Sequence, residues 1–271
     1  MSPLDMSAPR AVHRISYGPS AAQFGDLRLP SGPGPHPVVV ALHGGFWLAK
    51  HDLEHLGPLC DAVAAAGFAT WSLEYRRVGE AGGGFPGTFE DVAAGADALA
   101  ALAQSYPLDL GRVVALGHSA GGHLALWLGA RHRLPGGAVL HYAPAFPVAG
   151  VVALAPIGDL AQAFTLPWGN RVSALVGGGP VDVPERYAVA SPAALLPLGV
   201  RQIVIHGADD EDVPLALSEA WAARARAAGD TIDLEVVAGA GHFEPIDPAS
   251  SVWPTVQRAL WTLIEPVGPR H

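Results

Sequence analysis

A serine at position 119 stands between two segments that predict different secondary structure. The stretch RVVALGHSAGGHLALWLGA (residues 112–130) begins with an apolar run typical of a buried strand and continues with a run typical of a helix. The pattern G-x-S-x-G at such a junction indicates a sharp turn that raises the hydroxyl above the carboxyl edge of a sheet. There, free helix N–H groups favour negative charge. Ser119 is therefore a candidate nucleophile, and the alternative is a helix N-cap serine.

A second motif, HGGFW from His43 to Trp47, ends an earlier strand-like run. Acyl transfer builds negative charge on a carbonyl oxygen, and fixed N–H donors aimed at that oxygen accelerate the reaction. We expect the N–H groups of Gly45, Phe46 and Ala120, the last of which follows the candidate nucleophile, to form such an oxyanion hole. Without the serine motif, HGG would indicate only a tight turn.

The base and the acid that a serine nucleophile needs occur near the C-terminus. An imidazole must take the hydroxyl proton, and a carboxylate must orient that imidazole. The segment GAGHFEP supplies His242 in a glycine-rich loop. The segment HGADDEDVP supplies four consecutive acids, Asp209, Asp210, Glu211 and Asp212. The residue types alone leave the choice among these acids open.

Together these motifs resemble the esterase/lipase superfamily of α/β-hydrolases, in which the chain order is serine, acid, histidine. Members often carry H-G-x-x-D-x-x-V-P at this place, and matching HGADDEDVP to that pattern puts the acid at Asp210. HGGFW with GHSAGGH further resembles the arylformamidase (kynurenine formamidase) and small-carboxylesterase branches. The resemblance implies an α/β-hydrolase fold with Ser119, Asp210 and His242 as its catalytic triad.

The resemblance also implies a function, namely cleavage of carboxylic esters through an acyl-enzyme on Ser119. The short insertion and the aromatic residues described below make small or aromatic esters the expected substrates. An arylformamidase, which hydrolyses N-formylkynurenine, would use the same machinery and is the alternative. A catalytically silent hydrolase fold kept for binding is a third possibility, which the presence of all three triad residues disfavours. The expected partner is a small-molecule ester or amide.

The elements that must position these residues follow an α/β pattern. Apolar runs of strand length alternate with stretches of helical spacing, which predicts a mainly parallel sheet with helices on both faces. Strands are expected within residues 36–45, 68–76, 112–119, 150–156, 201–210 and 232–241. Helices are expected within residues 53–67, 88–104, 120–131, 214–229 and 251–267. A short antiparallel edge is expected from residues 11–18 and 24–30.

Residues 157–199 have no clear period and are rich in Pro, Gly and isolated aromatics. We expect a cap-like insertion over the upper edge of the sheet, within a single domain of residues 1–271, because long irregular loops in compact domains are usually functional. Its Phe164 and Trp168, with Trp47 and Phe85 from other loops, could line an apolar substrate pocket beside Phe46. The alternative is that Phe164 and Trp168 only attach the insertion to the sheet.

Two motifs have the spacing of ligand-binding sites but lack other residues that such sites require. GGGFPG (residues 82–87) fits the spacing of a dinucleotide loop, but Pro86 lacks an N–H and no acidic residue ends a strand about 20 residues later. HDLEH (residues 51–55) fits a zinc pattern, but zinc needs a further ligand and a helix entry explains the polarity. We therefore expect no cofactor and no metal.

The composition of the chain disfavours nucleic acids and membranes as partners. The chain has 271 residues, 16 basic against 25 acidic, and a net charge of −9, which disfavours binding to nucleic acid. Its single cysteine cannot form an internal disulfide, and no apolar run approaches the roughly 20 residues of a membrane helix. The start lacks the zones of a secretory signal, so we expect a cytoplasmic protein without membrane contact.

Overall fold

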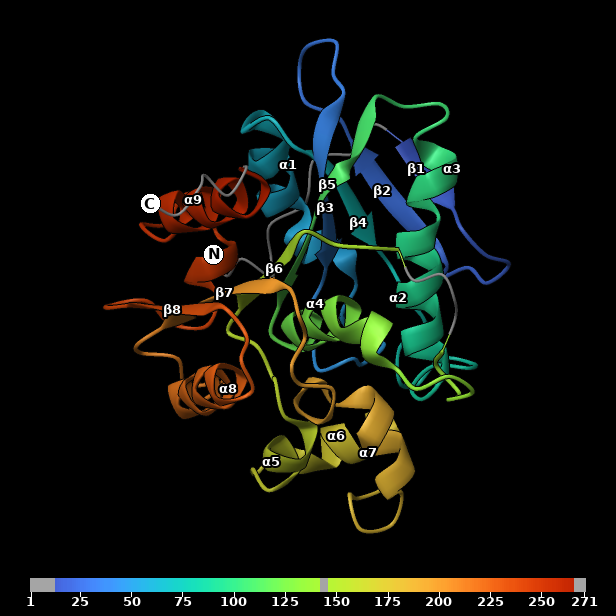
Figure 1. Ribbon diagram of the computed structural model, residues 1–271, viewed down its shortest axis with the longest axis vertical. Coiled ribbons are helices and arrows are strands. Elements are labelled where there is room, and N and C mark those ends of the chain that lie inside the picture. Colours follow the sequence, from blue (N-terminus) through green and yellow to red (C-terminus); the bar gives the residue numbers. More distant parts are fainter. Residues whose placement is uncertain (1–12, 142–145, 266–271) are drawn as a thin grey trace.

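The computed structural model describes residues 13–141 and 146–265. Its centre is an eight-stranded sheet in the order β1-β2-β4-β3-β5-β6-β7-β8 (Figure 1). The two pairings that involve β2 are antiparallel and the others are parallel, as predicted. The strands are β1 (His13–Ser16), β2 (Phe24–Arg28), β3 (His36–Leu42), β4 (Ala69–Leu73), β5 (Leu108–His118), β6 (Gly150–Leu154), β7 (Arg201–Gly207) and β8 (Ile232–Val237).

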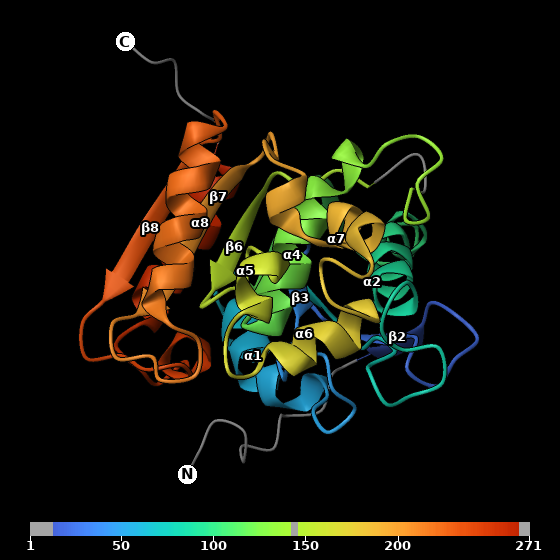
Figure 2. The same ribbon diagram turned by 90° about the horizontal axis from the view of Figure 1, so that it is seen from below.

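Helices cover both faces of the sheet (Figures 1 and 2). One face carries α1 (Gly57–Ala65) and α9 (Trp253–Ile264), and the other carries α2 (Gly87–Asp97), α3 (Leu99–Leu102), α4 (Ala120–Ala130) and α8 (Leu215–Ala227). Short 3₁₀ helices are η2 (Leu53–Leu56), η3 (Arg131–Arg133), η4 (Pro192–Ala194) and η5 (Glu244–Ile246). Across the described residues, no helix has both the length and the apolar character that a bilayer crossing requires.

The side chains of strand β3 show that the sheet is buried on both faces. Val38, Val40 and Leu42 belong to the core beneath α2 and α4, whereas Val39 and Ala41 belong to the core beneath α1 and α9. A strand covered on both faces is apolar at every position instead of alternating. The continuous run PVVVAL in the sequence therefore marks a central strand.

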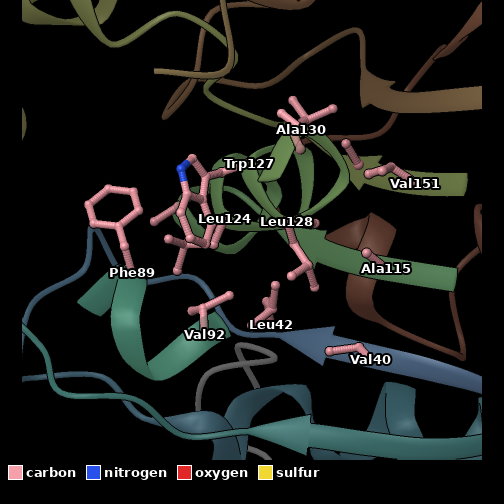
Figure 3. Close-up of a cluster of buried hydrophobic side chains, with 14 of the residues drawn as sticks. Val40, Leu42, Phe89, Val92, Ala115, Leu124, Trp127, Leu128, Ala130 and Val151 are labelled. Atoms are coloured by element: carbon pink, nitrogen blue, oxygen red, sulfur yellow. The ribbon is translucent and has the colours of Figure 1, made fainter. Parts of the chain in front are cut away.

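Helix α4, which follows the candidate nucleophile, is buried along its whole length. Leu128 points toward Leu42 and Ala115 of the sheet, whereas Trp127 lies beside Phe89 of α2, with ring centroids 5.1 Å apart (Figure 3). A helix that is apolar all round must be enclosed on all sides. This enclosure fixes the helix end that carries Ser119.

The segment of residues 157–199 contains helices that its irregular pattern did not predict. It forms α5 (Leu160–Phe164), α6 (Gly169–Val176), α7 (Pro184–Ala190) and η4, and these helices lie together beside α4 at one end of the molecule (Figures 1 and 2). Asp159 caps α5 by accepting from two backbone N–H groups, and Gly177 ends α6 with a left-handed φ of 84°. Helices this short do not span enough turns for a period to be visible.

Candidate active site

Ser119 occupies a strained turn between β5 and α4. Its φ of 56° and ψ of −118° lie outside the regions that non-glycine residues favour. A Cβ on Gly117 would lie 2.0 Å from the carbonyl oxygen of Gly121, and a Cβ on Gly121 would lie 2.0 Å from that of Leu42. Both glycines are therefore required by backbone contacts. The Ser119 N–H donates to the Leu154 carbonyl at 2.8 Å, which ties the turn to β6.

The acid and the base predicted from the sequence are in contact. Asp210 follows β7 and His242 follows β8, and Asp210 Oδ2 lies 2.7 Å from His242 Nδ1. Asp210 Oδ1 accepts from the N–H groups of Asp212 and Val213 at 2.9 and 2.8 Å. The side chain of Asp210 is fully buried, whereas Asp209, Glu211 and Asp212 are exposed.

His206, at the end of β7, supports this acid. Its Nε2 lies 3.2 Å from Asp210 Oδ2 and 2.9 Å from the Val213 carbonyl, and its Nδ1 lies 2.7 Å from the Ser218 hydroxyl. Burial alone would raise the pKa of Asp210, but hydrogen bonds from His206 and His242 outweigh it and hold the pKa below its usual range. Asp210 is therefore a carboxylate whose position is fixed from two sides.

His118, next to Ser119, contacts the base from the other side. Its Nε2 lies 2.8 Å from the His242 carbonyl oxygen, and the two rings lie 4.5 Å apart between centroids. Burial, followed by the proximity of His242, lowers the pKa of His118 well below its ordinary value. Since a carbonyl only accepts, the neutral ring carries its proton on Nε2 and donates it. His118 thus holds the backbone of His242.

The HGGFW loop has three consecutive residues with positive φ: Gly45 at 101°, Phe46 at 52° and Trp47 at 59°. A Cβ on Gly45 would lie 2.4 Å from the Cβ of His51, so this position requires glycine. Among the described residues, no hydrogen-bond acceptor contacts the N–H groups of Gly45 and Phe46. Ala120 begins α4, where the first N–H groups have no partner within the helix. These are the three donors predicted for the oxyanion hole.

Buried polar residues after β4 hold this loop. Glu74 Oε1 lies 3.0 Å from His43 Nε2, and Glu74 Oε2 accepts from the Leu53 N–H at 3.1 Å. The Tyr75 hydroxyl donates to the His43 carbonyl at 2.8 Å, and the two rings stack with centroids 4.3 Å apart. Glu74 and Tyr75 were not predicted from the sequence. An acidic residue at the end of an apolar strand was the available signal.

A cavity of about 170 Å³ borders Ser119. We call it the Ser119 cavity, and its walls include Ser119, His242, Gly45, Phe46, Phe243, His51, His55, His118, Arg171 and Asp212. The structure therefore brings the candidate nucleophile, the base and part of the predicted oxyanion loop to one small space.

The four aromatic residues expected to line the pocket are not among the residues that line the Ser119 cavity. Trp47 is fully buried, and its indole donates to the Ala120 carbonyl at 3.1 Å because its positive φ turns it under α4. Trp168 lies behind Phe46, with ring centroids 5.2 Å apart. Phe164 contacts the position of Gly179 within the insertion. Phe85 packs against Phe89, and its N–H donates to the Leu175 carbonyl.

The two histidines of HDLEH, His51 and His55, line the Ser119 cavity. Burial lowers the pKa of His55 to about 3 and also lowers that of His51, so both rings are neutral near pH 7. Within residues 13–141 and 146–265, no group of three or more His, Cys, Asp or Glu side chains is placed to hold a metal ion. His51 and His55 are thus neutral polar groups on the wall of the cavity.

Three solved structures that are similar to this chain are described as esterases. A truncated carbohydrate esterase from gut microbiota aligns with a TM-score of 0.83 at 20% identity, covering 98% of this chain and 100% of that one. Esterase B from Lactobacillus rhamnosis aligns with a TM-score of 0.80 at 20% identity, covering 96% and 89%. Butyrate-bound Est2 from Thermogutta terrifontis aligns with a TM-score of 0.73 at 20% identity, covering 96% and 97%.

These likenesses establish the predicted α/β-hydrolase fold. The descriptions of these three structures name esterases and no arylformamidase. No curated protein matches the sequence. The BD-FAE family matches residues 26–224, which span the strained serine turn, the HGGFW loop and Asp210. The chain belongs to the BD-FAE family.

Proposed function

We propose that the protein hydrolyses carboxylic esters of small substrates through an acyl-enzyme on Ser119. The observation that carries the proposal is the 2.7 Å contact between Asp210 and His242, with His242 and Ser119 on the walls of one cavity. A carboxylate fixes the tautomer of a histidine, and that histidine can then activate a serine. The structural neighbours that are described as esterases support the same reaction class.

In the proposed mechanism, Asp210 holds the Nδ1–H of His242, so Nε2 is free to take a proton. His242 removes the proton of the Ser119 hydroxyl while the oxygen attacks the ester carbonyl. The N–H groups of Gly45, Phe46 and Ala120 bind the resulting oxyanion. The C–O bond to the alcohol then breaks and the alcohol leaves with the proton from His242. Water, activated by the same histidine, hydrolyses the acyl-enzyme and releases the acid.

The size of the Ser119 cavity supports short substrates. Its volume of about 170 Å³ is below the roughly 300–1,000 Å³ of sites for drug-sized ligands. Phe46 and Phe243 give it an apolar part that suits a short or aromatic acyl group. A butyrate-bound structural neighbour supports this range of acyl length.

The test is a comparison of kcat/KM for p-nitrophenyl acetate, butyrate and laurate with that for N-formylkynurenine. We expect acetate or butyrate to be the best substrate and the formamide to be slower by orders of magnitude. Faster hydrolysis of laurate would contradict the small-substrate proposal. A large preference for N-formylkynurenine would instead favour the arylformamidase alternative.

A further inference from the structure

Arg171 of α6 lies on the wall of the Ser119 cavity with its guanidinium over the ring of Phe46, 3.9 Å from Cζ to the ring centroid. Other half-buried arginines of this chain are satisfied by carboxylates; for example, Arg76 pairs with Asp91 and Arg77 with Glu80. Among the described residues, no carboxylate lies within ion-pair distance of Arg171. A guanidinium beside the cavity therefore has no carboxylate partner within these residues.

The charges around the Ser119 cavity favour an anion beside Arg171. The pKa of His51 is lowered mainly by burial and next by the charge of Lys50, with a further contribution from Arg171. Lys50 is the single lysine of a chain whose net charge is −9. His51 and His55 on the cavity wall are neutral near pH 7 because their pKa values are lowered. Neutral rings add no negative charge, so they do not pair with the guanidinium as a carboxylate would.

Among the described residues, the carboxylates of Asp52, Asp210 and Asp212 lie near the same cavity, and none forms an ion pair with Arg171. Asp52 is exposed to solvent and accepts from the Glu54 N–H. Asp210 is fully buried behind His242 and accepts from His242, Asp212 and Val213. Asp212 is on the cavity wall but is exposed to solvent, where water screens its charge. Arg171 is half-buried against Phe46, so its charge is screened less.

We propose that Arg171 is a specificity-determining residue that binds a carboxylate on the substrate, and that the preferred substrates are therefore esters carrying a carboxylate. The planar fork of a guanidinium matches the two oxygens of a carboxylate, and stacking on an aromatic ring fixes its plane. The proposal rests on the proposed ester hydrolysis at Ser119. It adds the chemical class of the substrate to that reaction.

The experiment uses two matched pairs of esters. Monoethyl succinate is compared with ethyl 4-methylpentanoate, which replaces the carboxylate of the acyl part by an isopropyl group. In the second pair, 4-acetoxybenzoate is compared with its methyl ester, so that the carboxylate lies on the alcohol part. For each ester, kcat and KM are measured for the wild type and for Arg171→Gln, and the ratio between proteins cancels the intrinsic reactivity of the ester.

We expect Arg171→Gln to lower kcat/KM about tenfold or more for the anionic member of at least one pair, mainly through KM, since it removes charge-assisted hydrogen bonds. The neutral members should change less than twofold. Higher ionic strength should weaken the preference of the wild type for the anionic ester. The matched control is Arg186→Gln, which removes a guanidinium over Phe85, 5.4 Å from the ring centroid and away from the Ser119 cavity, and it should change neither pair.

A similar change for anionic and neutral esters would overturn the proposal, because Arg171 would then act only by packing on Phe46. In that case the neutral esters are still hydrolysed, and the proposed function stands. If the wild type hydrolyses none of the four esters, the proposed function itself fails. Because Arg171→Gln could unfold α6, inhibition of the wild type by benzoate and by benzamide is also measured. Stronger inhibition by benzoate supports the carboxylate site, and equal inhibition contradicts it.

Discussion

At the scale of single residues, contacts select one acid from four. Asp209, Asp210, Glu211 and Asp212 are equivalent in type, and only the resemblance to H-G-x-x-D-x-x-V-P singled out Asp210 in the sequence. The structure places the carboxylate of Asp210 against His242 and leaves the other three exposed. A carboxylate held by His206 and two backbone N–H groups cannot move away from the base.

Asp210→Asn should lower kcat by about 10⁴, because an amide at this position favours the wrong tautomer of His242. The measurement is steady-state hydrolysis of p-nitrophenyl butyrate, with Asp212→Asn as the matched control that keeps nearly the full rate. A nearly normal rate for Asp210→Asn would move the acid to Asp209 or Asp212.

The supporting residues at this scale were not predictable from the sequence. His118 hydrogen-bonds the carbonyl of His242, which is 124 positions away in the sequence, and Glu74 hydrogen-bonds the ring of His43, which is 31 positions away. Such contacts depend on which strand ends meet, and no local spacing encodes them. Trp47 was expected in the substrate pocket because of its position in HGGFW, but its positive φ turns the ring into the core.

At the scale of elements, the serine turn is defined by small residues. The motif GHSAG was sufficient to predict a turn between a strand and a helix, because glycine tolerates close backbone approach. The structure adds the partners of these contacts, namely the carbonyl of Leu42 on β3 and the Gly121 carbonyl of α4. The turn is thus fixed between two elements that pack on each other.

Gly121→Ala should therefore distort the turn, since its Cβ would meet the Leu42 carbonyl at 2.0 Å. We expect a loss of stability of at least about 1–3 kcal/mol and of most activity. Thermal unfolding and kcat are measured beside Gly136→Ala, where a Cβ meets nothing within 4 Å. Equal behaviour of the two variants would show that the turn tolerates a side chain.

The HGGFW loop is held by residues that follow β4, and a second variant can measure this dependence. Tyr75→Phe removes the donor to the His43 carbonyl, and we expect kcat to fall by roughly tenfold to a hundredfold through misplacement of the loop. Tyr187→Phe is the control, since that hydroxyl donates to the Gly178 carbonyl within the insertion. A kcat equal to wild type in Tyr75→Phe would mean that other contacts suffice to hold the loop.

At the scale of the whole molecule, the sheet was the most predictable feature. Runs such as PVVVAL in β3 are apolar at every position, and such a run predicts a buried strand even when the neighbouring strands are unknown. The helices α5 to α7 escaped prediction because they contain five, eight and seven residues. Arg171 lies on one of them, so its place on the cavity wall could not be foreseen.

Buried neutral histidines make the whole fold sensitive to acid. Burial lowers the pKa of His55 to about 3, that of His123 to about 4, and that of His118 well below its ordinary value of 6.5. Below about pH 6.5 the unfolded chain therefore binds more protons than the folded one, and stability falls as the pH falls. Asp210, with its lowered pKa, adds to this loss below about pH 4, where the unfolded carboxyl protonates.

Urea denaturation at several pH values from 8 to 4.5 should show a free energy of unfolding that decreases steadily below pH 6.5. His123→Gln removes one buried imidazole and should flatten the decrease. His132→Gln, at an exposed position, should leave it as in the wild type. A free energy of unfolding that is constant from pH 8 to 4.5 would contradict the assignment of these histidines as neutral.

The most direct test of the central claim is to find the residue that attacks the carbonyl. The wild type and Ser119→Ala are incubated with a fluorophosphonate, and intact and peptide mass spectrometry locate the adduct. We predict one adduct per wild-type chain on Ser119, no adduct on the variant, and a loss of turnover on the order of 10⁶ in the variant. An unlabelled Ser119 in active enzyme, or a Ser119→Ala variant that keeps its activity, would contradict the account.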